Sequence, residues 1–93
     1  MSKLIYVDID HTIARYESED DNGKYDKALP MLSRIERINS LYDAGNTIVY
    51  WTARGTMTGK NWFHITYKQL QSWGCRFHEL RMNKPAYDLF IDD

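Results

Sequence analysis

Two aspartates, Asp8 and Asp10, lie two residues apart directly after the apolar run 4–7. In an extended strand, side chains at this spacing point to the same face, so the two carboxylates lie close enough to repel each other. Such a pair needs a cation or a shared proton, unless the acids merely cap a turn. The spacing therefore indicates a chemical site at the carboxyl end of a buried strand.

Polar residues also follow two other apolar segments. Thr52 comes after the β-branched and aromatic run 46–51, and Asp92 and Asp93 come after the run 87–91. Ligands of open parallel sheets bind at the carboxyl ends of the strands, so we expect these side chains to meet at one rim. Carboxylates gathered there require a counter-charge. Mg²⁺ suits the rim because it takes oxygen ligands and holds only one or two carboxylates.

The elements that must position these residues follow from hydrophobic spacing and turn signals. Apolar residues recur at helical spacing in 32–42, and Gly45 and Gly74 are typical helix stops. The predicted order is a strand over 4–7, a flap or short hairpin over 13–30, a helix from Pro30 to Gly45, a strand over 46–51, a helix over 61–73, a short strand over 75–80 and a last strand over 87–91. This alternation predicts an α/β domain with a short, mostly parallel sheet.

Composition limits the class of protein. The 93 residues make one domain, 1–93, and 43% hydrophobic residues with 14% aromatics are ample for a folded core. A formal net charge of −1 disfavours nucleic-acid and membrane partners, which require a basic surface, and favours small ligands. Cys75 is the single cysteine, and no segment resembles a signal peptide. We therefore expect a cytoplasmic protein.

Four segments together resemble the motifs of the haloacid dehalogenase (HAD) superfamily. Asp8-Ile9-Asp10-His11-Thr12 matches its first motif, Thr52 the second, Lys84 the third and the pair Asp92-Asp93 the fourth. Segments such as YWTARG and KPAYDLFIDD look similar to small uncapped members found among bacterial capsule and surface-polysaccharide genes. The resemblance implies a small three-layer Rossmann-like domain without a cap.

The resemblance also implies roles for individual residues. Asp8 would attack phosphorus and become an aspartyl phosphate, while Asp10 would protonate the leaving oxygen and then activate water. Thr52 and Lys84 would stabilise the transferring phosphoryl group. The ligands of Mg²⁺ would be the carboxylates of Asp8 and Asp92 and the backbone carbonyl of Asp10, with Asp93 in support.

Three residues are candidates for substrate binding: Thr12, His11 and Arg54. His11 stands where the family commonly has glycine, and it is either a turn histidine facing solvent or a substrate contact. Arg54 either binds a substrate anion or is a solvated loop charge. Lys84 is a surface lysine unless the fold brings it to the aspartates.

The leading hypothesis is a Mg²⁺-dependent phosphatase that acts on a small phosphorylated metabolite, such as a sugar phosphate. Two alternatives stay open: a phosphatase for nucleic-acid or protein ends, and a regulatory module that binds metal or phosphate without turnover. Family members usually continue beyond the acidic pair. We therefore expect either a chain shorter than its natural product or a homo-oligomer formed through an exposed sheet edge.

Overall fold

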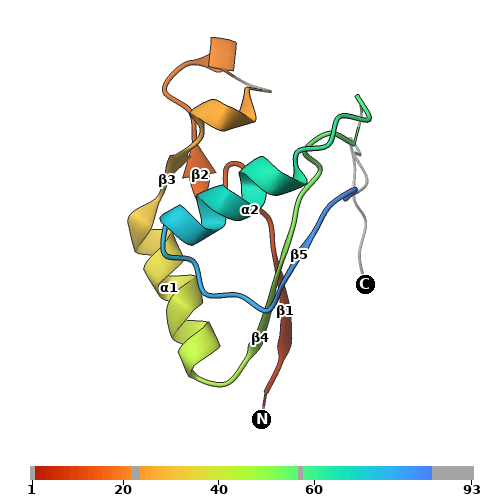
Figure 1. Ribbon diagram of the computed structural model, residues 1–93. Helices are drawn as coiled ribbons and strands as arrows, with labels where there is room; N and C mark the ends of the chain where they lie inside the picture. The colour runs from red at the N-terminus through yellow and green to blue at the C-terminus, as the bar shows by residue number, and fades with distance from the viewer. Residues whose placement is uncertain (1, 22–23, 57, 85–93) are drawn as a thin grey trace, which may run out of the picture.

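A three-stranded parallel sheet forms the centre of the protein. The computed structural model describes residues 2–21, 24–56 and 58–84. Strand β4 (Thr47–Trp51) lies between β1 (Leu4–Val7) and β5 (Glu79–Arg81). β1 and β5 each run parallel to β4, so the carboxyl ends of all three strands lie at the same end of the sheet (Figure 1).

Both helices, α1 (Leu32–Asp43) and α2 (Phe63–Ser72), lie on the same side of this sheet (Figure 1). Side chains alternate along β4, so Ile48 and Tyr50 share one face, and both are fully buried. They belong to a single core cluster, whose other members are Val7, Ile9, Ile13, Ala14, Ala28, Ile35, Leu70 and Leu80. The prediction of a small α/β domain with a mostly parallel sheet is confirmed. No helix in the described ranges is long and apolar enough to cross a bilayer.

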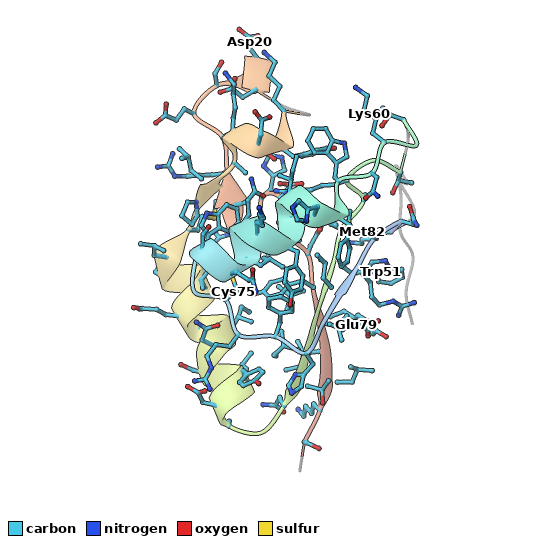
Figure 2. All side chains as sticks on the ribbon, viewed as in Figure 1. Asp20, Trp51, Lys60, Cys75, Glu79 and Met82 are labelled. Carbon is cyan, nitrogen blue, oxygen red and sulfur yellow. The ribbon has the colours of Figure 1, made fainter. Side chains whose placement is uncertain are left out.

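The other face of the sheet carries a cluster of long side chains. The rings of Tyr6 and Trp51 have their centres 5.6 Å apart, and the Arg81 guanidinium carbon lies 5.0 Å from the Trp51 ring. Trp51 projects from the strands away from the helices (Figure 2). Within residues 2–21, 24–56 and 58–84, no helix covers this face, so the third layer that the resemblance implies is not seen there.

Residues 13–21 and 24–30 belong to a flap at the carboxyl end of the sheet (Figure 1). Its base is a two-stranded antiparallel ribbon, β2 (Ala14–Arg15) with β3 (Leu29–Pro30), and its outer part contains the 3₁₀ turns Glu19–Asp21 and Tyr25–Lys27. The predicted flap or hairpin is therefore present in the described part of this segment.

Several predicted boundaries are wrong. Pro30 does not open α1, because it pairs with Ala14 in the ribbon, and the helix begins two residues later. The strand predicted over 75–80 is β5, which begins only at Glu79. Helix α2 begins at Phe63 rather than Asn61, whose side-chain oxygen instead accepts a hydrogen bond from the Phe63 amide (3.0 Å). The strand predicted over 87–91 lies outside the described residues.

Candidate active site

A tight loop after β1 holds the two motif aspartates. The carbonyl oxygen of Ile9 accepts hydrogen bonds from the amides of Thr12, Ile13 and Ala14 (2.9–3.1 Å). His11 closes the loop with φ 67°, in the left-handed region that non-glycine residues rarely occupy. Such conformations persist where the surrounding structure imposes them, and they gather at functional sites.

Asp8 forms an ion pair with Lys84, a residue 76 positions away. The Lys84 Nζ donates to Asp8 Oδ2 at 3.2 Å, and the Ile9 amide donates to Asp8 Oδ1 at 2.9 Å. The Asp8 side chain is still 44% exposed. A half-open carboxylate held by one cation can meet a ligand from solvent.

The continuation of the β4–β5 pairing places Lys84 beside Thr52. The Thr52 amide donates to the carbonyl of Arg81 (2.9 Å), and the Lys84 amide donates to the carbonyl of Thr52 (3.0 Å). Asn83, directly before Lys84, has φ 61°. The structure therefore brings Asp8 and Thr52 to one rim, as expected from their strands. It also brings Lys84 there, which the sequence alone left as a surface lysine. However, Thr52 is only 1% exposed, and its hydroxyl accepts a hydrogen bond from the Arg54 amide (3.1 Å).

Asp10 is paired with Arg54 in a two-point contact. The Arg54 Nε donates to Asp10 Oδ2 at 3.0 Å, and a terminal guanidinium nitrogen donates to Oδ1 at 2.8 Å. The Tyr16 hydroxyl also donates to Oδ1, at 2.7 Å. Both carboxylate oxygens of Asp10 therefore accept hydrogen bonds, and such forked charged contacts are both strong and directional.

Arg54 differs from both sequence hypotheses, because it is neither solvated nor free to meet a substrate anion. The residue is 2% exposed. Its remaining terminal nitrogen donates to Thr66 Oγ1 (3.1 Å) and Gln69 Oε1 (2.6 Å) on α2. The guanidinium carbon also lies 5.0 Å from the centre of the Tyr25 ring. A buried arginine needs such partners, since an unpaired buried charge is costly.

The flap contributes two tyrosines to the same group of residues. Burial and the hydrogen bond to Asp10 raise the pKa of Tyr16 well above its usual range, so this hydroxyl keeps its proton and remains a donor. The Tyr25 carbonyl accepts from the Gln69 amide nitrogen (2.7 Å), and the Tyr25 ring packs edge-on against Trp62 (5.1 Å). The flap is thereby joined to α2 next to the rim.

The other two substrate-binding candidates lie on the loop after β1. His11 is exposed, and its ring centre lies 6.0 Å from that of Tyr16. Thr12 is half-buried, and its carbonyl accepts a hydrogen bond from the Arg34 guanidinium (3.1 Å). His11 thus faces solvent close to Asp10, which keeps both of its proposed roles open.

A pocket of about 310 Å³ adjoins the rim. Its walls come from the loop after β4 and from the residues after β5, and Figure 2 shows the labelled Lys60 and Met82 at this end of the molecule. The lining residues are Arg54, Gly55, Gly59, Lys60, Asn61, Trp62, Met82 and Asn83. This mixed polar and aromatic pocket has room for a small organic group.

Two oxygen groups of the described residues are candidate ligands for a cation. Asp8 offers a half-exposed carboxylate, and no donor among the described residues contacts the backbone carbonyl of Asp10. One carboxylate and one carbonyl suit Mg²⁺, which retains several waters. The Asp10 carboxylate itself is engaged by Arg54. The described ranges contain no group of three His, Cys, Asp or Glu side chains able to hold a metal, and the candidate ligands Asp92 and Asp93 lie outside those ranges.

Sequence reasoning missed the partners of Arg54. Tyr16, Tyr25, Thr66 and Gln69 belong to no motif, and they come from the flap and from one helix. The available signal was that two polar residues, Thr66 and Gln69, lie three positions apart on the inward spacing of the predicted helix 61–73. That spacing alone does not identify a buried arginine as their partner.

Comparisons with known proteins support the fold. No protein-family model matches the chain, and no curated protein does. Among solved structures, the crystal structure of an MCSG target from Vibrio cholerae is similar, with a TM-score of 0.80 and 27% sequence identity. The likeness covers 100% of this chain and 80% of the other. The description of that structure states no activity.

Proposed function

We propose that this protein is a Mg²⁺-dependent phosphomonoesterase of the HAD type, acting on a small phosphorylated metabolite such as a sugar phosphate. The observation that carries the proposal is the contact between Lys84 Nζ and Asp8 Oδ2 at 3.2 Å. A half-open carboxylate beside a fixed cation suits attack on a phosphate ester, whose charge the cation helps to stabilise.

Asp8 is the nucleophile in this proposal. Its carboxylate attacks phosphorus, the bond from phosphorus to the ester oxygen breaks, and an aspartyl phosphate forms on Asp8. Water then cleaves that acyl phosphate, which regenerates the carboxylate and releases inorganic phosphate. Lys84 counters the negative charge of the phosphoryl oxygens. Mg²⁺ would be held by Asp8, the Asp10 carbonyl and the acidic pair Asp92-Asp93, and it would supply further positive charge for the same oxygens.

Asp10 handles the protons in this proposal. It delivers a proton to the ester oxygen as that oxygen leaves, and it takes a proton from the attacking water in the second step. The adjoining pocket of about 310 Å³ has the size for the organic part of a small substrate. Lys60, Asn61 and Asn83 on its walls offer polar groups to hydroxyls or a second anion.

The engagement of Asp10 by Arg54 also fits a second candidate, a module that binds metal or phosphate without turnover. Both Asp10 oxygens already accept hydrogen bonds from Arg54 and Tyr16. In a binding module, Asp10 would never exchange a proton and would serve only to hold the loop after β1.

Hydrolysis of a panel of phosphate monoesters with and without Mg²⁺ separates the two candidates. The panel contains 4-nitrophenyl phosphate, phenyl phosphate and several sugar phosphates. Wild type should turn over some of these only with Mg²⁺, and Asp8→Asn should lose at least about a hundredfold in kcat, because the nucleophile is gone. Asp43→Asn is the matched control, since Asp43 is also a half-exposed carboxylate in an ion pair, with Arg76.

Equal rates for wild type and Asp8→Asn would remove the catalytic proposal. Beryllofluoride, which mimics a phosphoryl group on a carboxylate, tests the covalent step directly. Formation of an adduct on wild type and Asp43→Asn, but not on Asp8→Asn, would support the aspartyl phosphate. Phosphate or Mg²⁺ binding by a protein that hydrolyses no ester would favour the binding module.

A further inference from the structure

The geometry points to Arg54 as the positioning residue that holds Asp10 in line for proton transfer and joins it to the flap and to α2. The inference deepens the proposed function and depends on it. The sequence analysis named Arg54 as a candidate for substrate binding, but in the structure its side chain is buried behind the rim.

The first argument is the geometry of the pair. Arg54 contacts Asp10 through two nitrogens of one planar group, at 3.0 and 2.8 Å. A two-point contact fixes both the position and the plane of the carboxylate, whereas a single hydrogen bond leaves the plane free to rotate. Lysine, a compact point charge, cannot reproduce this contact.

The second argument is how firmly Arg54 itself is held. On its far side, one nitrogen donates to Thr66 Oγ1 at 3.1 Å and to Gln69 Oε1 at 2.6 Å, so α2 orients the guanidinium. Gln69 donates in turn to the Tyr25 carbonyl at 2.7 Å, and the Tyr25 ring lies against the guanidinium face. A catalytic carboxylate needs support of this kind, because small displacements of reacting groups lower the rate strongly.

The third argument is the location of Arg54 between Asp10 and the pocket. Arg54 lines the pocket beside Gly55 and Trp62, while its guanidinium contacts Asp10. Trp62 also touches the ring of Tyr25. The wall that would face the leaving group and the carboxylate that would protonate it are thus parts of one connected set of side chains.

A leaving-group comparison tests this role. Phenyl and 4-nitrophenyl phosphate have nearly the same shape, but phenolate is much more basic than 4-nitrophenolate and depends more on a well-placed acid. Arg54→Lys should lower kcat/KM for phenyl phosphate by about tenfold or more and that for 4-nitrophenyl phosphate by about threefold at most. Arg76→Gln is the control, because Arg76 also pairs with a carboxylate and stacks on a tyrosine, but at the surface.

A double-mutant cycle gives a second readout. If Arg54 acts through Asp10, then adding Arg54→Lys to Asp10→Asn should change kcat/KM for either ester by less than about twofold. Thr66→Val, which leaves the Arg54–Asp10 pair intact and removes one group that orients it, should shift the leaving-group ratio in the same direction by a smaller factor. Thermal unfolding shows whether each variant folds. If Arg54→Lys does not fold, the leaving-group ratio of Thr66→Val tests the inference instead.

Two results would overturn the inference and leave Arg54 a purely structural residue. One is that Arg54→Lys lowers kcat/KM equally for the two esters. The other is that Arg54→Lys lowers kcat/KM as much in the Asp10→Asn variant as in wild type. Failure of the proposed function is distinguishable. In that case wild type and Asp8→Asn would hydrolyse both esters equally, or not at all, before any Arg54 variant is compared.

Discussion

At the scale of single residues, the rim contains two aspartates with opposite surroundings. Asp8 is 44% exposed and has one cationic partner, whereas the Asp10 carboxylate is largely covered and accepts from two side chains. Asp8 is therefore open to a ligand, whereas Asp10, two residues later, lies behind it. This difference supports the proposed division between a nucleophile, Asp8, and a proton carrier, Asp10.

Two tyrosines, the partly buried Tyr16 and the fully buried Tyr50, should respond in opposite ways when their hydroxyls are removed. The Tyr16 hydroxyl donates to Asp10, while the buried Tyr50 hydroxyl makes no regular hydrogen bond among the described residues and has only the Cys75 thiol, a weak partner, beside it. Tyr16→Phe should lower the free energy of unfolding by about 1–2 kcal/mol, because a hydrogen bond to a charged group is lost. Tyr50→Phe should leave it unchanged or raise it by up to about 1 kcal/mol, because it removes an unsatisfied polar group. Urea unfolding of both variants measures the difference.

A result in which both variants lose the same stability would contradict this prediction. It would mean that the Tyr50 hydroxyl has a partner or that the ring packing differs between the two residues. Far-UV circular dichroism of the folded variants checks that neither substitution rearranges the sheet.

At the scale of elements, the loop after β4 is built around a close approach of two backbone segments. Gly55 has φ 80°, and a Cβ at this position would lie 2.1 Å from the carbonyl oxygen of Lys60. Gly59 has a similar φ of 73°, but a Cβ there would meet nothing within 4 Å. The two glycines are four residues apart in one loop and form a natural pair for comparison.

Gly55→Ala should damage this loop, and Gly59→Ala should not. Both substitutions cost about 1 kcal/mol for the left-handed backbone, but only the first forces the loop to open. We expect Gly55→Ala to lose at least about 2 kcal/mol of stability and to change the shape of the pocket. Thermal unfolding would report the loss of stability. Quenching by acrylamide of Trp62 fluorescence, in variants where Trp51 and Trp73 are replaced by phenylalanine, would report the change at the pocket. Equal behaviour of the two variants would show that the Gly55 contact is not required.

The flap is the element whose attachment matters most for the site. Its tyrosines reach Asp10 and Arg54, although the base of the flap is a ribbon of only two residues per strand. Such a short ribbon is marginal by itself. The side-chain contacts to Asp10, Arg54 and Gln69 therefore hold the flap over the rim as much as its own hydrogen bonds do.

At the scale of the whole molecule, one buried and two partly buried groups make stability sensitive to high pH. Burial raises the pKa of Cys75 from 9.0 to about 11, and it also raises the pKa values of Tyr16 and Tyr50 above their usual range. As pH rises, the unfolded chain loses these protons first while the folded protein retains them. The unfolded state then binds fewer protons, so the free energy of unfolding falls with increasing pH.

The contribution of Cys75 to the free energy of unfolding should be fully present below pH 9 and lost by about pH 11. Urea unfolding at a series of pH values from 7 upward should therefore show stability declining above pH 9. Cys75→Ser, which has no group titrating in this range, should show a shallower decline. A wild-type profile that stays flat to pH 11 would contradict the prediction.

Much of the architecture could be read from the sequence because it depends on local patterns. Helical spacing in 32–42, the β-branched run 46–51 and the stops at Gly45 and Gly74 each predict an element that the structure contains. The errors lie at boundaries, where neighbouring segments compete. Pro30 is compatible with the start of a helix or the end of a strand. In the structure it pairs with Ala14 and ends strand β3.

The sequence by itself determined that Asp8 and Asp10 follow a strand, and the order of strands indicated that Thr52 would come to the same rim. Only the family resemblance suggested a place there for Lys84. Tertiary structure alone decided the partners. Asp10 lies 44 positions from Arg54 and Asp8 lies 76 from Lys84, and no local preference specifies contacts over such separations. They arise because parallel strands end together, and because a buried arginine must find acceptors wherever packing places them.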